Sequence, residues 1–321
     1  MTYQVQTVSS VGDIPSIALA FAAARGWTTT STELTVPNGR KFEISALTNG
    51  DPYAGKHRVI IKDSLDPTNR FTSVASPQLG GTEFAPIIKN PTKIHMFGNN
   101  IPYSPTPYIA IVIEYGFNLY RHIYIGVTVK SGNYTGGEII AGNHFPSNLY
   151  GSNSTPWYES RLLFRGHHGR NYGNSYIGSG GVNIVHVENP IPFRKFKFDG
   201  LLTDLLGNEV FGGEGDGIND TLIKKSYASF AAATVLVPVN LFCPNASEGA
   251  NYNIRPIGWV EGVCMVDMKN LEVGQSILVG SQTWRVFPQF RKSSAQVASL
   301  DGGYYFADET SYNSGLAYRE S

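Results

Sequence analysis

The sequence contains only two cysteines, Cys243 and Cys264, and they share no metal-binding or redox spacing. Two thiols without such a spacing build neither a disulfide framework nor a zinc site. Both lie in apolar surroundings, "NLFCPN" and "GVCMVD", where a cysteine serves as a small hydrophobic residue. We therefore interpret them as core residues in preference to a bridge.

The chain also lacks an excess of charge of either sign. It carries 25 basic and 25 acidic side chains, and charged residues make up only 16% of the 321 positions. Nothing electrostatic attracts such a chain to nucleic acid or to an anionic membrane, so we expect neither as a partner. A low charge density fits a surface that is taken up by permanent protein interfaces.

Long apolar segments are missing as well. No apolar run approaches the ~18 to 20 residues that span a bilayer, and the first residues, "MTYQVQTVSS", have no basic region followed by an apolar one. A secretory signal consists of a basic region followed by an apolar one. We expect synthesis in a cytoplasm.

The common signatures of nucleotide binding and hydrolysis are absent from the sequence, and the remaining chemical candidates are weak. His167 and His168 are adjacent in "FRGHHGRN", so in an extended segment they point to opposite sides and make a poor chelating pair. The loop "GGEGDGIND" at 212–220 resembles a calcium loop, but Asp216 comes one position early and no second copy exists. We expect no metal, no cofactor and no enzymatic activity.

Two further possibilities stay open. A glycosidase needs only two carboxylates at the right separation, which a sequence does not show, so pairs such as Glu138 with Glu159 or Asp216 with Glu261 stay open as candidates. Aromatic residues in the Gly-rich region form a possible sugar platform or, as we favour, anchor their loops to a sheet. They are Trp157, Tyr158, Tyr172 and Tyr176.

What the sequence does contain favours β-structure. Glycine (35), tyrosine (18), phenylalanine (17) and proline (18) are plentiful, a mixture that suits short strands and many turns. Period-two patterns bounded by turn residues predict strands. They fall at 41–47, 56–63, 70–76, 107–115, 119–130, 160–166, 182–188, 257–267 and 275–290, and "GSQ" within the last of these segments fits a short hairpin loop. Gly116 is expected to take a positive φ in the hairpin turn between 107–115 and 119–130.

One helix is well marked, in "DIPSIALAFAAARG" at 13–26. Apolar residues recur at i, i+3, i+4 and i+7 and form a single stripe, which includes Ile14, Ile17 and Phe21. We expect Asp13 to cap the first turn, Arg25 to complement the C-terminal dipole and Gly26 to end the helix. A second helix at 219–234 is a weaker prediction.

The predicted fold class is mainly β, with β-sandwich-like sheets, one N-terminal α-helix and long Gly/Asn-rich loops. We divide the chain into a helix-plus-sheet domain at 1–130, a loop-rich β region or insertion at 131–250, and a C-terminal hairpin section at 251–321 that completes the sheet. No repeat at a fixed period indicates a propeller or solenoid.

The stretch "EYGFNLYRHIYIGVTVK" at 114–130 raises the question of whether its polar and aromatic residues form a functional site or a structural packing surface. Alternation directs Tyr120, His122 and Tyr124 to one face and Ile123 and Ile125 to the other. No nucleophile stands beside His122 in a recognisable arrangement. We interpret the tyrosine face as a structural packing surface, buried against a second sheet, the helix or a neighbouring subunit.

Three blocks of the sequence resemble a family of tailed-bacteriophage virion proteins encoded among head-to-tail and tail genes. The first is "FAAARGW" at 21–27, and the second is the hairpin "YIAIVIEYGFNLYRHIYIGV" at 108–127 followed by "YTGGEIIAGNHFP" at 134–146. The third is "GVCMVDMKNLEVGQSILVGSQTWRVFP" at 262–288. Together they cover about a fifth of the 321 residues.

The resemblance implies a structural component of the virion, a ring or collar at the head-to-tail neck or on the tail, which contacts copies of itself and other neck or tail proteins. Candidate interface residues are Tyr120, His122, Tyr124, Trp157 and Tyr158. A baseplate or tail-tip component is an alternative. A second alternative is a receptor-binding adhesin that uses the loops at 131–180 to bind host glycans.

Overall fold

A computed structural model describes the chain at residues 2–37, 39–48, 57–65, 71–76, 78–82, 85–88, 90–116, 119–133, 135–142, 182–188, 197–199, 211–212, 235–245, 253–268, 270–289 and 314–321. In these residues the protein is mainly β, with several antiparallel sheets and one short N-terminal α-helix. The fold class predicted from the sequence is therefore confirmed.

A seven-stranded sheet, the central sheet, runs through the middle of the molecule. In spatial order its strands are β1 (Thr2–Thr7), β9 (Lys93–Gly98), β10 (Tyr108–Glu114), β11 (Tyr120–Val127), β13 (Thr135–Gly142), β14 (Val182–Glu188) and β15 (Lys197–Asp199). All neighbouring pairs are antiparallel. Buried residues line both faces of β10 and β11, so this sheet needs a layer on each side.

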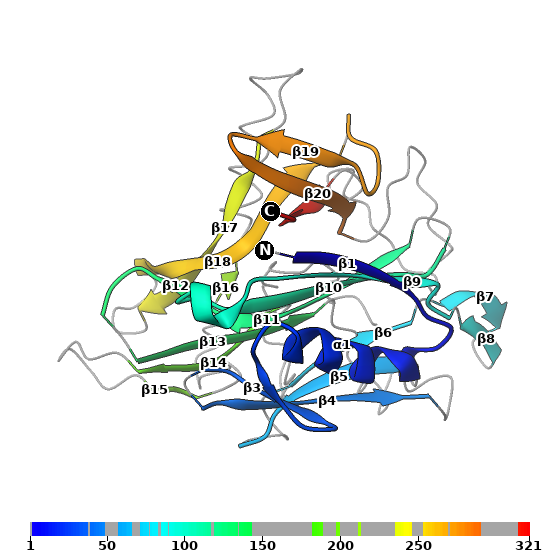
Figure 1. Cartoon of the computed structure of the whole chain (residues 1–321), viewed down its shortest axis with the longest axis horizontal. Helices are drawn as coiled ribbons and strands as arrows, with labels where there is room; N and C mark the ends of the chain where they lie inside the picture. Colours follow the sequence, from blue (N-terminus) through cyan, green and yellow to red (C-terminus); the bar gives the residue numbers. More distant parts are fainter. Residues whose placement is uncertain are drawn as a thin grey trace.

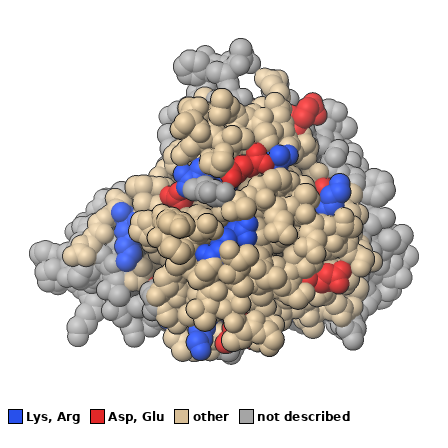
Figure 2. Space-filling view, viewed as in Figure 1, with Lys and Arg blue, Asp and Glu red and all other residues tan. Residues whose placement is uncertain are grey.

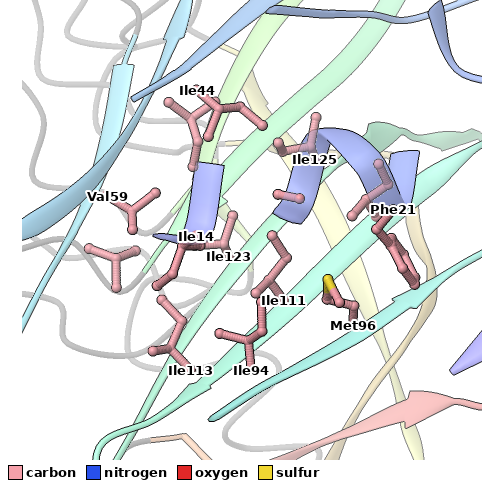
Figure 3. Close-up of a cluster of buried hydrophobic side chains, with 14 of the residues drawn as sticks. Ile14, Phe21, Ile44, Val59, Ile94, Met96, Ile111, Ile113, Ile123 and Ile125 are labelled. Atoms are coloured by element: carbon pink, nitrogen blue, oxygen red, sulfur yellow. The ribbon is translucent and has the colours of Figure 1, made fainter. Parts of the chain in front are cut away.

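The first covering layer combines the helix with a second sheet, the N-terminal sheet. Its strands, in order, are β2 (Thr28–Thr29), β3 (Glu33–Thr35), β4 (Lys41–Leu47), β5 (Arg58–Asp63) and β6 (Phe71–Ala75). Helix α1 (Ile14–Ala23) follows a 3-10 turn, η1 (Val11–Asp13). Figure 3 shows Ile14 and Phe21 of the helix beside Ile111 and Ile123 of the central sheet, and these residues share one buried apolar cluster.

The second covering layer is the C-terminal sheet. It contains β16 (Phe211–Gly212), β17 (Val237–Asn245), β18 (Asn253–Asp267), β21 (Ser314–Arg319), β20 (Gln282–Pro288) and β19 (Ser276–Val279) in that order, and β12 (Val129–Lys130) pairs with β18. Figure 1 shows the resulting stack, with β17 to β20 above the central sheet and α1 with β3 to β5 below it. A small hairpin of β7 (Gln78–Thr82) and β8 (Ala85–Ile88) stands apart at one side.

Several local predictions are confirmed. Strand β4 spans the predicted 41–47, and Gly116 and Gly26 have φ angles of 77° and 84°. Arg25 donates from Nη1 to the Phe21 carbonyl at 2.7 Å, which satisfies a group at the C-terminal end of the helix. The second helix predicted at 219–234 and the strand at 160–166 lie outside the described residues.

Two local predictions are wrong. Asp13 does not bond the amides of the first helical turn; its carboxylate instead accepts hydrogen bonds from the preceding amides of Ser9 and Ser10, at 3.0 Å each, because the 3-10 turn has its own cap at Ser10. The strand predicted at 119–130 is not continuous. It leaves the central sheet after Val127, and Thr128 bonds the Gly137 carbonyl through both its amide and its hydroxyl.

Candidate functional site

The tyrosine and histidine face of β11 lies between the central and C-terminal sheets. Tyr120 and Tyr124 belong to the buried cluster that also contains Phe287 and Tyr318, whereas Ile123 and Ile125 belong to the helix-side cluster. His122 is fully buried in the same layer as the two tyrosines. Of the three partners that the sequence allowed, the structure places a second sheet of the same chain against this face.

His122 bridges the two sheets through both ring nitrogens. Its Nε2 lies 2.8 Å from the Pro288 carbonyl oxygen and its Nδ1 lies 2.6 Å from the Tyr318 hydroxyl oxygen. A carbonyl only accepts, so Nε2 carries the proton and Nδ1 accepts from the tyrosine. Burial lowers the pKa of His122 to about 3, and the nearby Arg121 charge acts in the same direction. The imidazole is therefore neutral and has its tautomer set by the C-terminal sheet.

Tyr108 and Tyr124 of the central sheet form a second contact with the C-terminal sheet. Their rings stack with centroids 5.7 Å apart, and the Tyr124 hydroxyl donates to the Glu261 carbonyl at 3.1 Å. Burial raises the pKa of both hydroxyls. Gly262, with φ of 70°, lets the Tyr108 ring approach so closely that an added Cβ would lie 2.1 Å from it. The glycine is thus required by the aromatic layer as well as by its backbone conformation.

A polar chain borders this layer where β1 meets the C-terminal sheet. The Tyr3 hydroxyl lies 2.8 Å from His95 Nδ1, and His95 Nε2 lies 3.2 Å from the Glu114 carboxylate. The guanidinium of Arg285 lies 4.5 Å from the Tyr3 ring centroid and its Nε donates to Glu320 at 2.6 Å. Burial raises the pKa of Tyr3, whereas the bond from His95 lowers the pKa of Glu114.

These groups join the central sheet to the C-terminal sheet through hydrogen bonds and ring contacts. His122 is buried and neutral, and each of its nitrogens is engaged by the opposite sheet. Burial raises the pKa of the Tyr3 hydroxyl, which is protonated and forms a hydrogen bond with His95. The geometry joins three segments that are far apart in the sequence, near residues 3, 95 to 122, and 285 to 320.

The other residues named from the sequence are only partly placed. Trp157, Tyr158, Tyr172, Tyr176, His167, His168, Glu159 and Asp216 lie outside the described residues. Glu138 is buried in β13, and Glu261 forms an ion pair with Arg319. Cys264 is a free thiol that packs against apolar neighbours, and burial raises its pKa to about 12. For Cys264 the interpretation as a core residue holds.

Sequence reasoning missed several members of the inter-sheet contact. Tyr3, His95 and Tyr318 lie in segments of only six residues, "TYQVQT", "KIHMFG" and "SGLAYR". Their signal is an alternation that spans only two or three larger apolar side chains in each segment. Such a signal becomes specific only when the pairing partner is known.

Within the described part of the chain, no three His, Cys, Asp or Glu side chains gather closely enough to hold a metal ion. The helices found there are all too short or too polar to cross a membrane. Figure 2 shows one face of the molecule, on which charged side chains are scattered among mostly uncharged ones. The sequence matches no protein-family model, and a search of curated proteins finds no match.

Proposed function

We propose that this protein is a non-enzymatic structural component of a tailed-phage particle, which forms a ring or collar at the head-to-tail neck or on the tail. Its role is geometric: it adds binding area around the channel and holds neighbouring subunits in place. The proposed location is the virion, and the proposed partners are copies of this chain and other neck or tail proteins.

The observation that carries the proposal is that the three sequence blocks that resemble the phage family pack against one another. "FAAARGW" contributes Phe21 and Trp27 to the helix-side cluster, which also contains Ile111 and Ile123 of the hairpin block. On the opposite face the hairpin block meets the third block, where Tyr120 and Tyr124 share a cluster with Val263 and Phe287. The residues that resemble the phage family therefore form much of the buried core on both faces of the central sheet. This is expected when members of a family share a fold rather than a catalytic site.

The surface offers support of a second kind. Charged residues are only 16% of the chain, and several large apolar side chains are exposed. Tyr103 is 86% exposed, Leu65 and Leu278 are 74% exposed, and Val5 is 49% exposed. Scattered exposed apolar groups are ordinary in a monomer. Together with a low charge density they suit a protein that becomes covered on assembly.

The test is a density map of the intact particle in which this chain is traced. We expect copies in multiples of six, the symmetry implied by the resemblance to tail proteins, with Tyr103 or Leu278 in contacts between chains. A particle that lacks the chain contradicts the proposal. In isolation we expect a monomer or small oligomer that assembles only on a viral partner.

Measurements on the isolated protein distinguish the alternatives. A stable trimer in light scattering that resists dilution, combined with binding of host glycans, favours the adhesin. Release of reducing ends from host polysaccharide or peptidoglycan favours an enzyme. A chelator and substitution of His167, His168 or Asp216 then identify metal-dependent turnover. If no reducing ends are released, the assembly component and the adhesin remain as the two candidate functions.

A further inference from the structure

Strand β1 forms one edge of the central sheet. It pairs with β9 over six residues, from Thr2 opposite Gly98 to Thr7 opposite Lys93. In the part of the chain that the structure describes, no strand pairs with its other side. Figure 1 shows β1 between β20 above and α1 below. Only Tyr3 is partly buried and the other five side chains are exposed, so the sheet ends at β1 in an exposed edge.

The backbone groups on this outer edge belong to three residues of β1. The Val8 amide donates to the Thr92 carbonyl at 3.1 Å, so Val8 directs its backbone towards β9. In an antiparallel ladder, alternate residues direct their N–H and C=O groups to the same neighbour. The even-numbered residues of β1 therefore face β9, whereas Tyr3, Val5 and Thr7 direct their N–H and C=O groups outwards. These groups can accept a further strand.

The edge lacks the features that prevent strands from pairing between molecules. Proteins protect their edge strands by making them very short or by adding charges, prolines or bulges. Strand β1, "TYQVQT", has no charged residue and no proline, and its register with β9 shows no bulge. The other edge strands of the described sheets have only two to five residues. Strand β1 is therefore the longest edge in the described part of the chain.

Contacts within the chain hold β1 in place at both ends. The Tyr3 hydroxyl lies 2.8 Å from His95 Nδ1. After the strand, Val8 is buried and the two amides that follow it bond the Asp13 carboxylate at 3.0 Å each. An edge that is fixed before binding loses little conformational entropy when a partner strand is added. The outer side of β1 is thus a preformed template.

The strand is complementary to a reversed copy of itself. In an antiparallel pair with its twofold axis at Val5, Val5 lies opposite Val5, Tyr3 opposite Thr7, and Gln4 opposite Gln6. All three residues with outward backbone groups then form hydrogen-bonded pairs, and a slip of one residue removes these bonds. The glutamine amides can each donate and accept, and no like charges face each other. A second copy of the chain therefore satisfies the whole edge.

We propose that the outer edge of β1 binds a second copy of this chain, and that the two copies pair antiparallel with Val5 at the twofold axis. The two central sheets then form one continuous sheet, and each copy keeps its own ladder between β1 and β9. Both copies use the same surface, so the contact closes as a dimer and does not continue into a filament. The proposal concerns the protein in isolation, so it can fail separately from the phage proposal.

The test places a charge at the axis. Val5→Lys brings two lysines face to face in the pair and Val5→Glu brings two glutamates, and like charges directly opposite each other destabilise paired strands. We expect the parent protein to have the molar mass of a dimer in sedimentation velocity at low ionic strength. Each variant alone should have half that mass, and an equimolar mixture of the two should return to the dimer mass.

Gln4→Lys is the matched control, because its lysine faces Gln6 of the other copy and not a second lysine. It should dimerise as the parent does. Val5 is 49% exposed, so its variants should keep the fold, and circular dichroism checks this. A parent protein with the mass of one chain at every concentration overturns the proposal, as does a dimer that Val5→Lys leaves intact. Failure of the mixture to dimerise overturns the position of Val5 at the axis.

Discussion

His122 and Tyr318 are 196 residues apart in the sequence, and their side chains meet at 2.6 Å between the central and C-terminal sheets. Their rings are nearly parallel, with an interplanar angle of 10°. A stacked pair joined by a hydrogen bond, with the second imidazole nitrogen on Pro288, makes the junction directional as well as apolar. Such buried, fully bonded groups favour one register of two packed layers over others.

Tyr318→Phe tests the hydrogen bond while keeping the ring. The variant leaves the Nδ1 acceptor of His122 without its donor in a site where both residues are 0% exposed. A buried polar atom that loses its partner costs about 1 to 3 kcal/mol of unfolding free energy. Denaturant titration at neutral pH measures the loss. An unchanged unfolding free energy would show that this bond does not stabilise the junction.

Replacing the histidine changes the response to acid. Because the pKa of His122 is about 3 when folded and about 6.5 in an unfolded chain, only the unfolded state takes up the proton as the pH falls from 6.5 towards 3. Native stability conferred by the neutral ring is therefore present above about pH 6.5 and decreases by up to about 1.4 kcal/mol per pH unit below it.

His122→Gln removes this titration, and its amide can still donate to Pro288 and accept from Tyr318. We expect the variant to be less stable than the parent at pH 7 and the difference to shrink towards pH 4. Unfolding free energies measured at both pH values give the comparison, and the other titrating groups are common to both proteins. Equal losses in the two proteins would contradict the assigned state of His122.

Gly262→Ala separates steric overlap from backbone strain. At this position the added Cβ meets the Tyr108 ring at 2.1 Å and the φ angle is 70°. Gly274→Ala is the matched control, since its φ is 74° and nothing lies within 4 Å. The control should lose about 1 to 2 kcal/mol from the left-handed conformation. Gly262→Ala should lose a further 1 to 3 kcal/mol or so from overpacking. Similar losses in thermal or denaturant unfolding would show that the Tyr108 contact is not close.

Phe21→Ala tests the helix stripe. Phe21 is 3% exposed and packs with the central sheet, so truncation should cost ~3 to 5 kcal/mol of unfolding free energy. Leu278→Ala is the control, because that side chain is 74% exposed and its truncation should change stability by less than about 0.5 kcal/mol. A loss for Phe21→Ala within the noise of the titration contradicts full burial of the stripe.

The parts of the fold that were predictable are those written locally in the sequence. The α-helix has its apolar stripe within ten residues, and in β4 the buried Phe42 and Ile44 alternate with less buried neighbours over residues 41–45. The hairpin of β19 and β20 turns at Gly280, whose φ is 62°, within the predicted "GSQ". In each case period and turn chemistry act over one element and its neighbour.

The parts that were not predictable depend on distant pairing. Strand β1 contains only Tyr3 and Val5 as larger apolar residues, and Val5 is half exposed. Strand β21 is six residues long, and its Leu316 and Tyr318 are buried because pairing with β18 and β20 places them against the central sheet. Alternation in β11 indicated a buried tyrosine face, but which layer covers it is decided by residues from 237 onwards.

The position of β21 also determines when the molecule can be finished during synthesis. It lies between β18 and β20, although it follows both in the sequence. While the polypeptide is still emerging from the ribosome, the central sheet can pack on α1, but β18 and β20 have no strand to join them. The cluster on the aromatic face of β11 therefore stays incomplete until Leu316 and Tyr318 arrive, and nascent chains stopped before residue 314 should be the ones that chaperones retain.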